Sequence, residues 1–149
     1  SGMENLMKDA SVVLTKEATT DLGRIFFQTI LFQDYCDYAN TACIEFMKRF
    51  SDDYEEGFWR YYKVGQNSGF MCPDTDNFYY FELSNYFSGK VSSEAAGIIV
   101  TLYIFQACFE DAYKNKDSEL CDHFREAINT LKDYAATIDE SGSIFRAID

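Results

Sequence analysis

The chain has 149 residues, of which 47% are hydrophobic, 17% aromatic and 26% charged, and its 25 acidic and 13 basic side chains give a net charge of −12. This apolar content excludes a disordered chain and predicts one packed domain over residues 1–149. The acidic balance disfavours direct binding to nucleic acid, because affinity for a phosphate backbone comes largely from Lys and Arg.

The cysteines and the N-terminus indicate a cytoplasmic protein. The five cysteines are odd in number and form no CxxC pair, which argues against a disulfide framework and favours reduced thiols. No secretory signal is visible, Ser1-Gly2 ahead of Met3 is typical of a cleavage scar from a tag, and residues 1–17 are expected to be flexible. The longest uncharged stretch, residues 95–109, is shorter than the roughly 20 residues of a membrane-spanning helix.

The first predicted elements are two helical segments within residues 21–50. In the second segment, apolar residues recur at steps of three and four and so predict one buried stripe. The stripe consists of Tyr35, Tyr38, Ala39, Ala42, Cys43, Phe46, Met47 and Phe50. Turn-forming residues and carboxylates over 51–57 then end the helix, as is typical of a solvated loop.

An aromatic β-hairpin follows. Residues 58–64 predict its first strand, residues 65–69 its connection and residues 70–72 its second strand. A third strand is predicted over residues 78–83, with a turn after it. Three short consecutive strands favour an antiparallel meander.

Two further helices are predicted. The first, over residues 93–113, is apolar nearly all the way round and should be the central, buried helix, with Ser92 or Ser93 as its N-cap. The second, over residues 118–137, has one apolar and one charged face. Strands between helical blocks predict an α+β fold in which about four helices pack against one small three-stranded antiparallel meander.

Patterns that would support catalysis or metal binding are weak. The single histidine, His123, lies two residues from Cys121 inside a predicted helix, where residues so spaced do not face each other. The cysteines lack the spacing of a zinc site, and acidic pairs such as Asp74 with Asp76 lack the Gly and Glu placement of a calcium loop. No phosphate-binding glycine loop is present. We therefore expect no catalytic centre, no metal and no cofactor.

The segment over residues 58–87 is rich in Phe, Tyr and Trp. Such rings could form a stacking platform for single-stranded nucleic acid, but the negative charge of the segment argues against it. We expect most of the rings to line the core. A few, with Trp59 as the candidate, are expected to face outward as protein-binding anchors.

Several ordered motifs within about residues 50–149 resemble the ArdB/KlcA antirestriction family. They are Ser51-Asp52-Asp53-Tyr54, Gly57-Phe58-Trp59-Arg60-Tyr61-Tyr62, Asn67-Ser68-Gly69-Phe70 through Pro73, Val91 to Ile98, Leu131-Lys132-Asp133-Tyr134-Ala135 and Ile144-Phe145-Arg146-Ala147-Ile148-Asp149. The first fifty residues depart from the family pattern, because they lack its Phe-Leu-Pro stretch. The N-terminal third is therefore expected to contact a different surface.

The resemblance implies a non-enzymatic protein that relieves type I restriction-modification cleavage of incoming mobile DNA, such as a plasmid. It would act in the bacterial cytoplasm through protein contacts with the type I complex, as a monomer or weak dimer, without a membrane. Within the matched motifs the predicted partner-binding residues are Trp59, Tyr61, Glu94, Arg146 and Asp149. Structural alternatives are that Glu94 only caps a helix and that Arg146 with Asp149 only ties down the tail.

Two other classes of function remain open from the sequence. An acidic DNA mimic would place carboxylates in the DNA groove of a restriction enzyme or another DNA-binding protein, and the net charge of −12 permits this. A compact aromatic-rich globule instead of an extended acidic rod argues against mimicry. An enzyme that modifies its target is the third class, which a stoichiometric metal or nucleotide would support.

Overall fold

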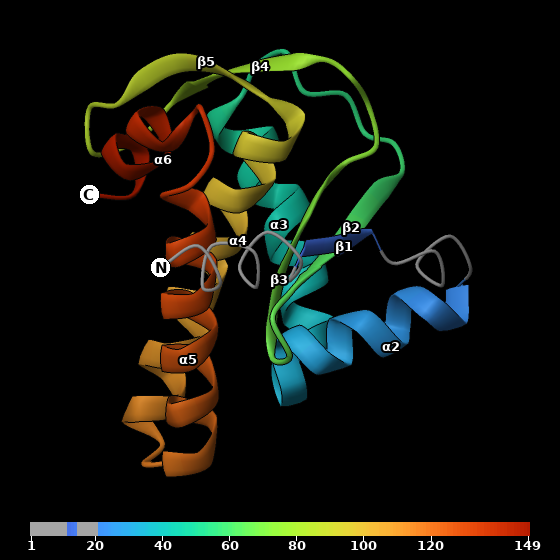
Figure 1. Cartoon of the computed structure of the whole chain (residues 1–149), viewed down its shortest axis with the longest axis vertical. Coiled ribbons are helices and arrows are strands. Elements are labelled where there is room, and N and C mark those ends of the chain that lie inside the picture. The colour runs from blue at the N-terminus through green and yellow to red at the C-terminus, as the bar shows by residue number, and fades with distance from the viewer. Residues whose placement is uncertain (1–11, 15–20) are drawn as a thin grey trace, which may run out of the picture.

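The computed structural model describes residues 12–14 and 21–149 (Figure 1). Their elements are β1 (Val12–Leu14), α2 (Asp21–Phe32), the 3-10 helix η2 (Gln33–Tyr35), α3 (Cys36–Phe50), β2 (Trp59–Val64), β3 (Ser68–Pro73), β4 (Phe78–Glu82), β5 (Ser88–Ser92), α4 (Ser93–Lys114), α5 (Ser118–Ala135) and α6 (Ser141–Ile148). The predicted tag scar at residues 1–2 lies outside the described residues, as does most of the predicted flexible segment 1–17.

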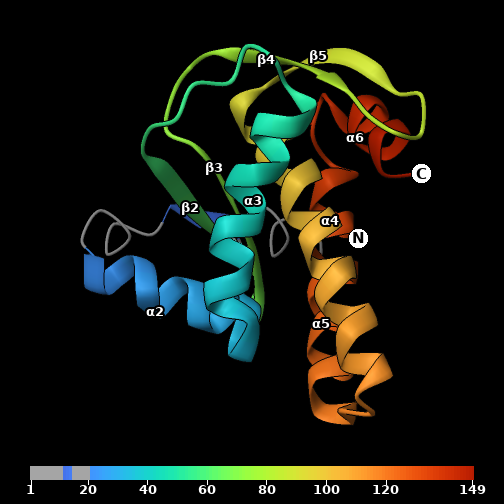
Figure 2. The same cartoon turned by 180° about the vertical axis from the view of Figure 1, so that it is seen from behind.

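Helix α4 lies at the centre of the fold, as predicted. It packs against α3, α5, α6 and β3, and Figures 1 and 2 show the same arrangement from opposite sides. By length and composition alone it could cross a membrane, but 67% of its most hydropathic window is buried inside the fold. Helices α2, α3 and α5 also confirm the predicted helical segments, with ends shifted by up to two residues.

The predicted hairpin is confirmed in the first sheet, whose antiparallel strand order is β1-β2-β3. Tyr61 lies opposite Met71 and Tyr62 opposite Phe70. The connection is shorter than predicted, because β3 already begins at Ser68 and Gly65 turns the chain with a φ of 65°. Glycine adopts this left-handed conformation without the steric cost of a side chain.

The predicted three-stranded meander of residues 58–83 is wrong. Residues 78–82 do form a strand, β4, but β4 pairs with β5 in a second antiparallel sheet. The place beside β3 is taken by α4, since the Thr101 hydroxyl hydrogen-bonds the Met71 N–H at 3.3 Å and its carbonyl at 3.5 Å. A helix therefore satisfies the strand edge that the meander would have used.

Close contact between α4 and β3 depends on Gly97. A Cβ atom at this position would lie 2.3 Å from Cys72 Cβ and 2.4 Å from the Met71 carbonyl oxygen. Real atoms do not approach so closely, so only glycine lets the helix backbone reach the strand. The motif 91–98 thus contains the residue that sets the distance between helix and sheet.

Helix α6 was not predicted from the sequence, from which we expected about four helices and a tail over residues 142–149. Its apolar residues are few and closely spaced, and the buried ones are Ile144 and Ala147. It packs against α4 and β5. A helix of two turns is decided by such tertiary contacts more than by its own periodicity.

Candidate functional site

The side chains of strand β2 point alternately to the two faces of its sheet. Trp59 and Tyr61 are buried and face one side of the sheet, whereas Arg60 and Tyr62 are half-buried and face the other. This alternation follows from the two-residue period of a strand. The aromatic motif therefore contributes to two different regions.

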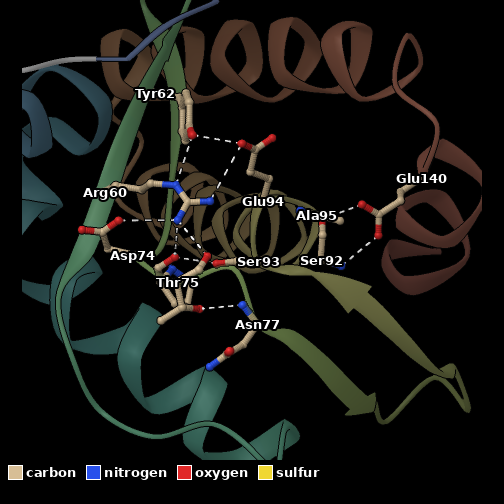
Figure 3. A network of polar contacts seen from close by, with 11 residues as sticks. Arg60, Tyr62, Asp74, Thr75, Asn77, Ser92, Ser93, Glu94, Ala95 and Glu140 are labelled. Atoms are coloured by element: carbon tan, nitrogen blue, oxygen red, sulfur yellow. Dashed lines mark hydrogen bonds and ion pairs between the residues drawn. The ribbon is translucent and has the colours of Figure 1, made fainter.

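The first region is a polar joint centred on Arg60, shown in Figure 3. Its guanidinium donates from Nε to the Tyr62 hydroxyl at 3.1 Å and from Nη1 to the carbonyls of Pro73 and Thr75 at 3.1 and 2.9 Å. Nη1 also lies 3.6 Å from a carboxylate oxygen of Asp74. One side chain thus fixes the path of the chain where it leaves β3.

Glu94 joins this network from the first turn of α4. Its carboxylate accepts a hydrogen bond from the Tyr62 hydroxyl at 2.9 Å and lies 3.8 Å from Arg60 Nη2. Burial raises the pKa of the Tyr62 hydroxyl, and the nearby Glu94 carboxylate raises it further while Arg60 opposes the shift. The hydroxyl therefore stays protonated at neutral pH and acts as the donor.

The N-terminus of α4 is held by a second pair of contacts. The Ser92 hydroxyl accepts from the Ala95 N–H at 3.2 Å, which confirms the predicted N-cap. The Glu140 carboxylate accepts from both the Ser92 N–H, at 2.9 Å, and the Ser92 hydroxyl (Figure 3). Glu140 directly precedes α6, so this contact ties α6 to the start of α4.

The second region is a groove between α2, α3 and the start of β2, with a volume of about 510 Å³. Trp59 and Tyr61 lie at its base, where each is less than a tenth exposed. Its lining includes Ile25 and Phe58, which are 61% and 75% exposed, together with the polar side chains of Arg24, Gln28 and Asn40. A concave site with a buried aromatic base and exposed apolar residues at its opening can receive an apolar side chain of a partner.

The expectation that Trp59 faces outward is wrong. Its indole N–H donates to the Tyr54 hydroxyl at 3.0 Å and its ring packs in the core. Tyr61 is also buried, and its hydroxyl accepts from Gln28 at 3.1 Å. The outward ring belongs to Phe58, the residue before β2, whereas Trp59 lies on the face of β2 that packs on the core.

The predicted residues Arg146 and Asp149 lie in a third place, at the end of α6. Both side chains are exposed, and Arg146 donates to the Ser143 hydroxyl at 3.3 Å. The tail is held through its backbone, because the Asn85 amide donates to the carbonyls of Arg146, Ala147 and Asp149. The five predicted residues are therefore not brought together.

Three residues with central structural contacts were missed, namely Arg60, Asn85 and Glu140. The sequence could have indicated Arg60, because a charged side chain within an aromatic strand becomes partly buried and then needs a polar partner. Asn85 and Glu140 lie far in the sequence from the groups they bind. No local pattern could have revealed those pairings.

The described residues show little that could act as a nucleophile. Burial raises the pKa of Cys72 and of Cys108 to about 12 and also raises the pKa of Cys43, so these thiols stay protonated and unreactive. His123 Nε2 donates to the Leu31 carbonyl at 2.7 Å. Within residues 23–149 no group of three His, Cys, Asp or Glu side chains is placed to hold a metal.

Comparison with protein families gives a match over residues 52–149 to the family described as Antirestriction protein. The chain is 33% identical over 105 residues to the antirestriction protein KlcA of Escherichia coli, an alignment that covers 69% of each chain. It is 37% identical over 108 residues to the uncharacterized protein YfjX of Escherichia coli (strain K12), covering 69% of this chain but only 65% of YfjX.

Among solved structures, that of the KlcA and ArdB proteins superimposes with a TM-score of 0.74 at 26% sequence identity. The superposition covers 93% of this chain and 95% of that one, so it includes α2 and α3, where the sequence departs from the family motifs. Those proteins are described as showing a novel fold and antirestriction activity against Type I DNA restriction systems in vivo but not in vitro.

Proposed function

The chain belongs to the antirestriction protein family, and from this premise we propose that it relieves type I restriction of incoming mobile DNA in the bacterial cytoplasm. The activity described for the KlcA and ArdB proteins against type I systems supports the proposal. The matched segment, residues 52–149, contains the whole hairpin, the central helix and the chain end.

We further propose that the protein acts without catalysis, through contacts with the type I restriction-modification complex. The groove beside Phe58 carries this proposal, because it presents exposed apolar side chains around a buried aromatic base. Such a geometry is that of a pocket for a partner's anchor residue. The raised pKa of the buried thiols supports a mechanism without a covalent step.

A DNA mimic is the second candidate, and one observation favours it. Around the start of α5, a groove of about 410 Å³ is lined by several carboxylates, among them Asp117, Glu119, Asp122 and Glu126. Carboxylates there could meet the basic side chains of a DNA-binding groove. Strong weakening of the complex by salt would favour this candidate over the contact model.

The test is the plating efficiency of unmodified phage on bacteria that carry an active type I system. Cells would express the wild type, Phe58→Ser, the control Tyr113→Gln or nothing, while methylation of the host DNA is followed in parallel. We expect the wild type and the control to raise plating by orders of magnitude with methylation intact, and Phe58→Ser to lose most of that effect. Tyr113 is a suitable control because it is 69% exposed and lies in the last turn of α4, away from the groove.

Two results would contradict the proposal. Unchanged plating on several type I systems, with folded and abundant protein, would remove the antirestriction function. Full activity of Phe58→Ser would leave that function standing and exclude the groove as its main contact. Measurement in cells is appropriate because the KlcA and ArdB activity is described in vivo but not in vitro.

A further inference from the structure

We propose that the outer face of the β4–β5 sheet is a docking surface for arginine side chains of a partner protein. This inference rests on the proposed function, because it names the chemistry of the partner contacted. It concerns a surface separate from the groove beside Phe58 and includes none of the five partner-binding residues predicted from the sequence.

The geometry of β4 presents two aromatic rings to solvent. Tyr79 and Phe81 point into the core, at 2% and 0% exposure, whereas Phe78 and Tyr80 point outward, at 56% and 43%. Residues two apart on a strand share one face, so the two outward rings are neighbours. Large apolar side chains that are exposed together mark interaction sites more often than isolated ones do.

Carboxylates surround these rings. Asp53 lies at the edge of β4, where its carboxylate accepts from the Tyr80 N–H at 3.2 and 3.3 Å. Glu82 follows Tyr80 at the next outward position of β4, and Asp76 is exposed two residues before Phe78. Lys90 is the single base among the residues of β4 and β5; it lies directly opposite Tyr80 on the same outer face, where the three carboxylates outnumber it. The face is therefore aromatic with a negative surround.

This combination selects for arginine. A guanidinium can stack on an aromatic face and at the same time pair with a neighbouring carboxylate, whereas a lysine ammonium stacks less well. Nucleic acid bases could also stack on the rings, but the carboxylates would repel the phosphates. Charge complementarity thus favours a basic protein surface, of the kind that a DNA-handling complex presents.

A partner can dock on the face of this sheet more readily than on its edges. On β4 the outward Tyr80 N–H is already bonded to Asp53, and on β5 the outward Ser92 N–H is bonded to Glu140. A strand added at either edge would have to displace the carboxylate bound there, Asp53 on β4 or Glu140 on β5. Docking on the rings requires no such change.

The test uses fluorescein-labelled nona-arginine and nona-lysine peptides with the full chain at physiological ionic strength. We expect the wild type to bind the arginine peptide about tenfold more tightly than the lysine peptide. The double variant Phe78→Thr, Tyr80→Thr should lose this preference, because threonine keeps strand propensity but removes the rings. The control Tyr113→Gln, which removes an exposed ring elsewhere, should keep it.

Three outcomes would overturn the inference: no preference for arginine in the wild type, an unchanged preference in the double variant, or loss of the preference on neutralising α5 with Asp122→Asn and Glu126→Gln. If the double variant unfolds, the single Tyr80→Thr replaces it, with a partial loss expected. Phage plating separates the two proposals. Full relief by a double variant that no longer discriminates between the peptides would exclude this face from the function and leave the proposed function intact, whereas no relief by the wild type would remove the function itself.

Discussion

Strand β2 divides two regions of opposite character, the polar joint around Arg60 and the groove beside Phe58. In the joint, the Arg60 guanidinium binds two backbone carbonyls, a tyrosine hydroxyl and two carboxylates. In the groove, Phe58 and Ile25 direct apolar surface to solvent. A side chain whose groups are satisfied within the fold stabilises it, whereas exposed apolar surface is available to a partner.

The difference shows what the family motifs encode. Motif 91–98 meets the hairpin motif residue by residue, since Ser93 donates to the Pro73 carbonyl, Glu94 binds Tyr62 and Gly97 lies against Cys72. These contacts are internal. Much of the resemblance to the family therefore records how helix α4 is joined to the hairpin, and only part of it records residues free to bind a partner.

The largest loss of stability is expected for Gly97→Ala, which disrupts the close contact between α4 and β3. The added Cβ would overlap Cys72 Cβ and the Met71 carbonyl, so α4 must move away from β3. We expect a loss of about 3 kcal/mol in the free energy of unfolding, measured by urea denaturation. Gly57→Ala is the matched control, because nothing lies within 4 Å of a Cβ there. Equal stability of the two variants would refute the tight packing.

Arg60→Met should have the next largest effect. It keeps the aliphatic stem but removes the donor to the Thr75 carbonyl, one of the donors to the Pro73 carbonyl, and the cation beside Glu94, which keeps its hydrogen bond from Tyr62. Because Glu94 is about half exposed, water compensates part of the loss, and we expect about 2 kcal/mol.

The control for this change is Arg125→Met. Arg125 pairs with Asp122 at 3.2 Å, but both side chains are more than half exposed, and such a pair contributes little. We expect the same urea experiment to detect almost no change. A loss as large as that of Arg60→Met would show that charge, not burial in the joint, decides the effect.

Ser92→Ala tests the link from the joint to α6. It removes the N-cap of α4 and one hydrogen bond to Glu140, so we expect a loss of about 1 kcal/mol. Thermal unfolding with Ser88→Ala as the control measures it, since Ser88 is exposed on the same strand. A stability equal to that of the control would mean that Glu140 holds the helix start through the Ser92 N–H alone.

Local patterns predicted most of the elements but not how they meet. The long apolar run of α4 and the aromatic hairpin have strong periodicity, and both were located within a few residues. The second sheet was missed because β5, with the sequence Ser-Gly-Lys-Val-Ser, has few strand formers, and because Thr101 of α4 takes the place beside β3 that β4 was predicted to fill. Helix α6 was missed because packing decides its formation.

For the candidate site, the sequence located the hairpin but misassigned its faces. Trp59 and Tyr61 share one face of β2, and that face packs on the core, so both predicted partner-binding rings are buried while Phe58, just before the strand, is exposed. Long-range pairs such as Asn85 with the end of α6 could not be inferred from spacing at all.

The smallest effect on stability, and the sharpest separation of the two regions, is expected for Phe58→Ser. With its ring 75% exposed, we expect the free energy of unfolding to stay within about 0.5 kcal/mol of the wild type. Arg60→Met, in contrast, should lower stability while leaving the groove residues unchanged. If restriction relief in cells depends on contacts made by the groove, Phe58→Ser will be stable but inactive. Arg60→Met, which is only less stable, will regain activity at lower growth temperature. Loss of stability in Phe58→Ser would instead make the groove part of the scaffold.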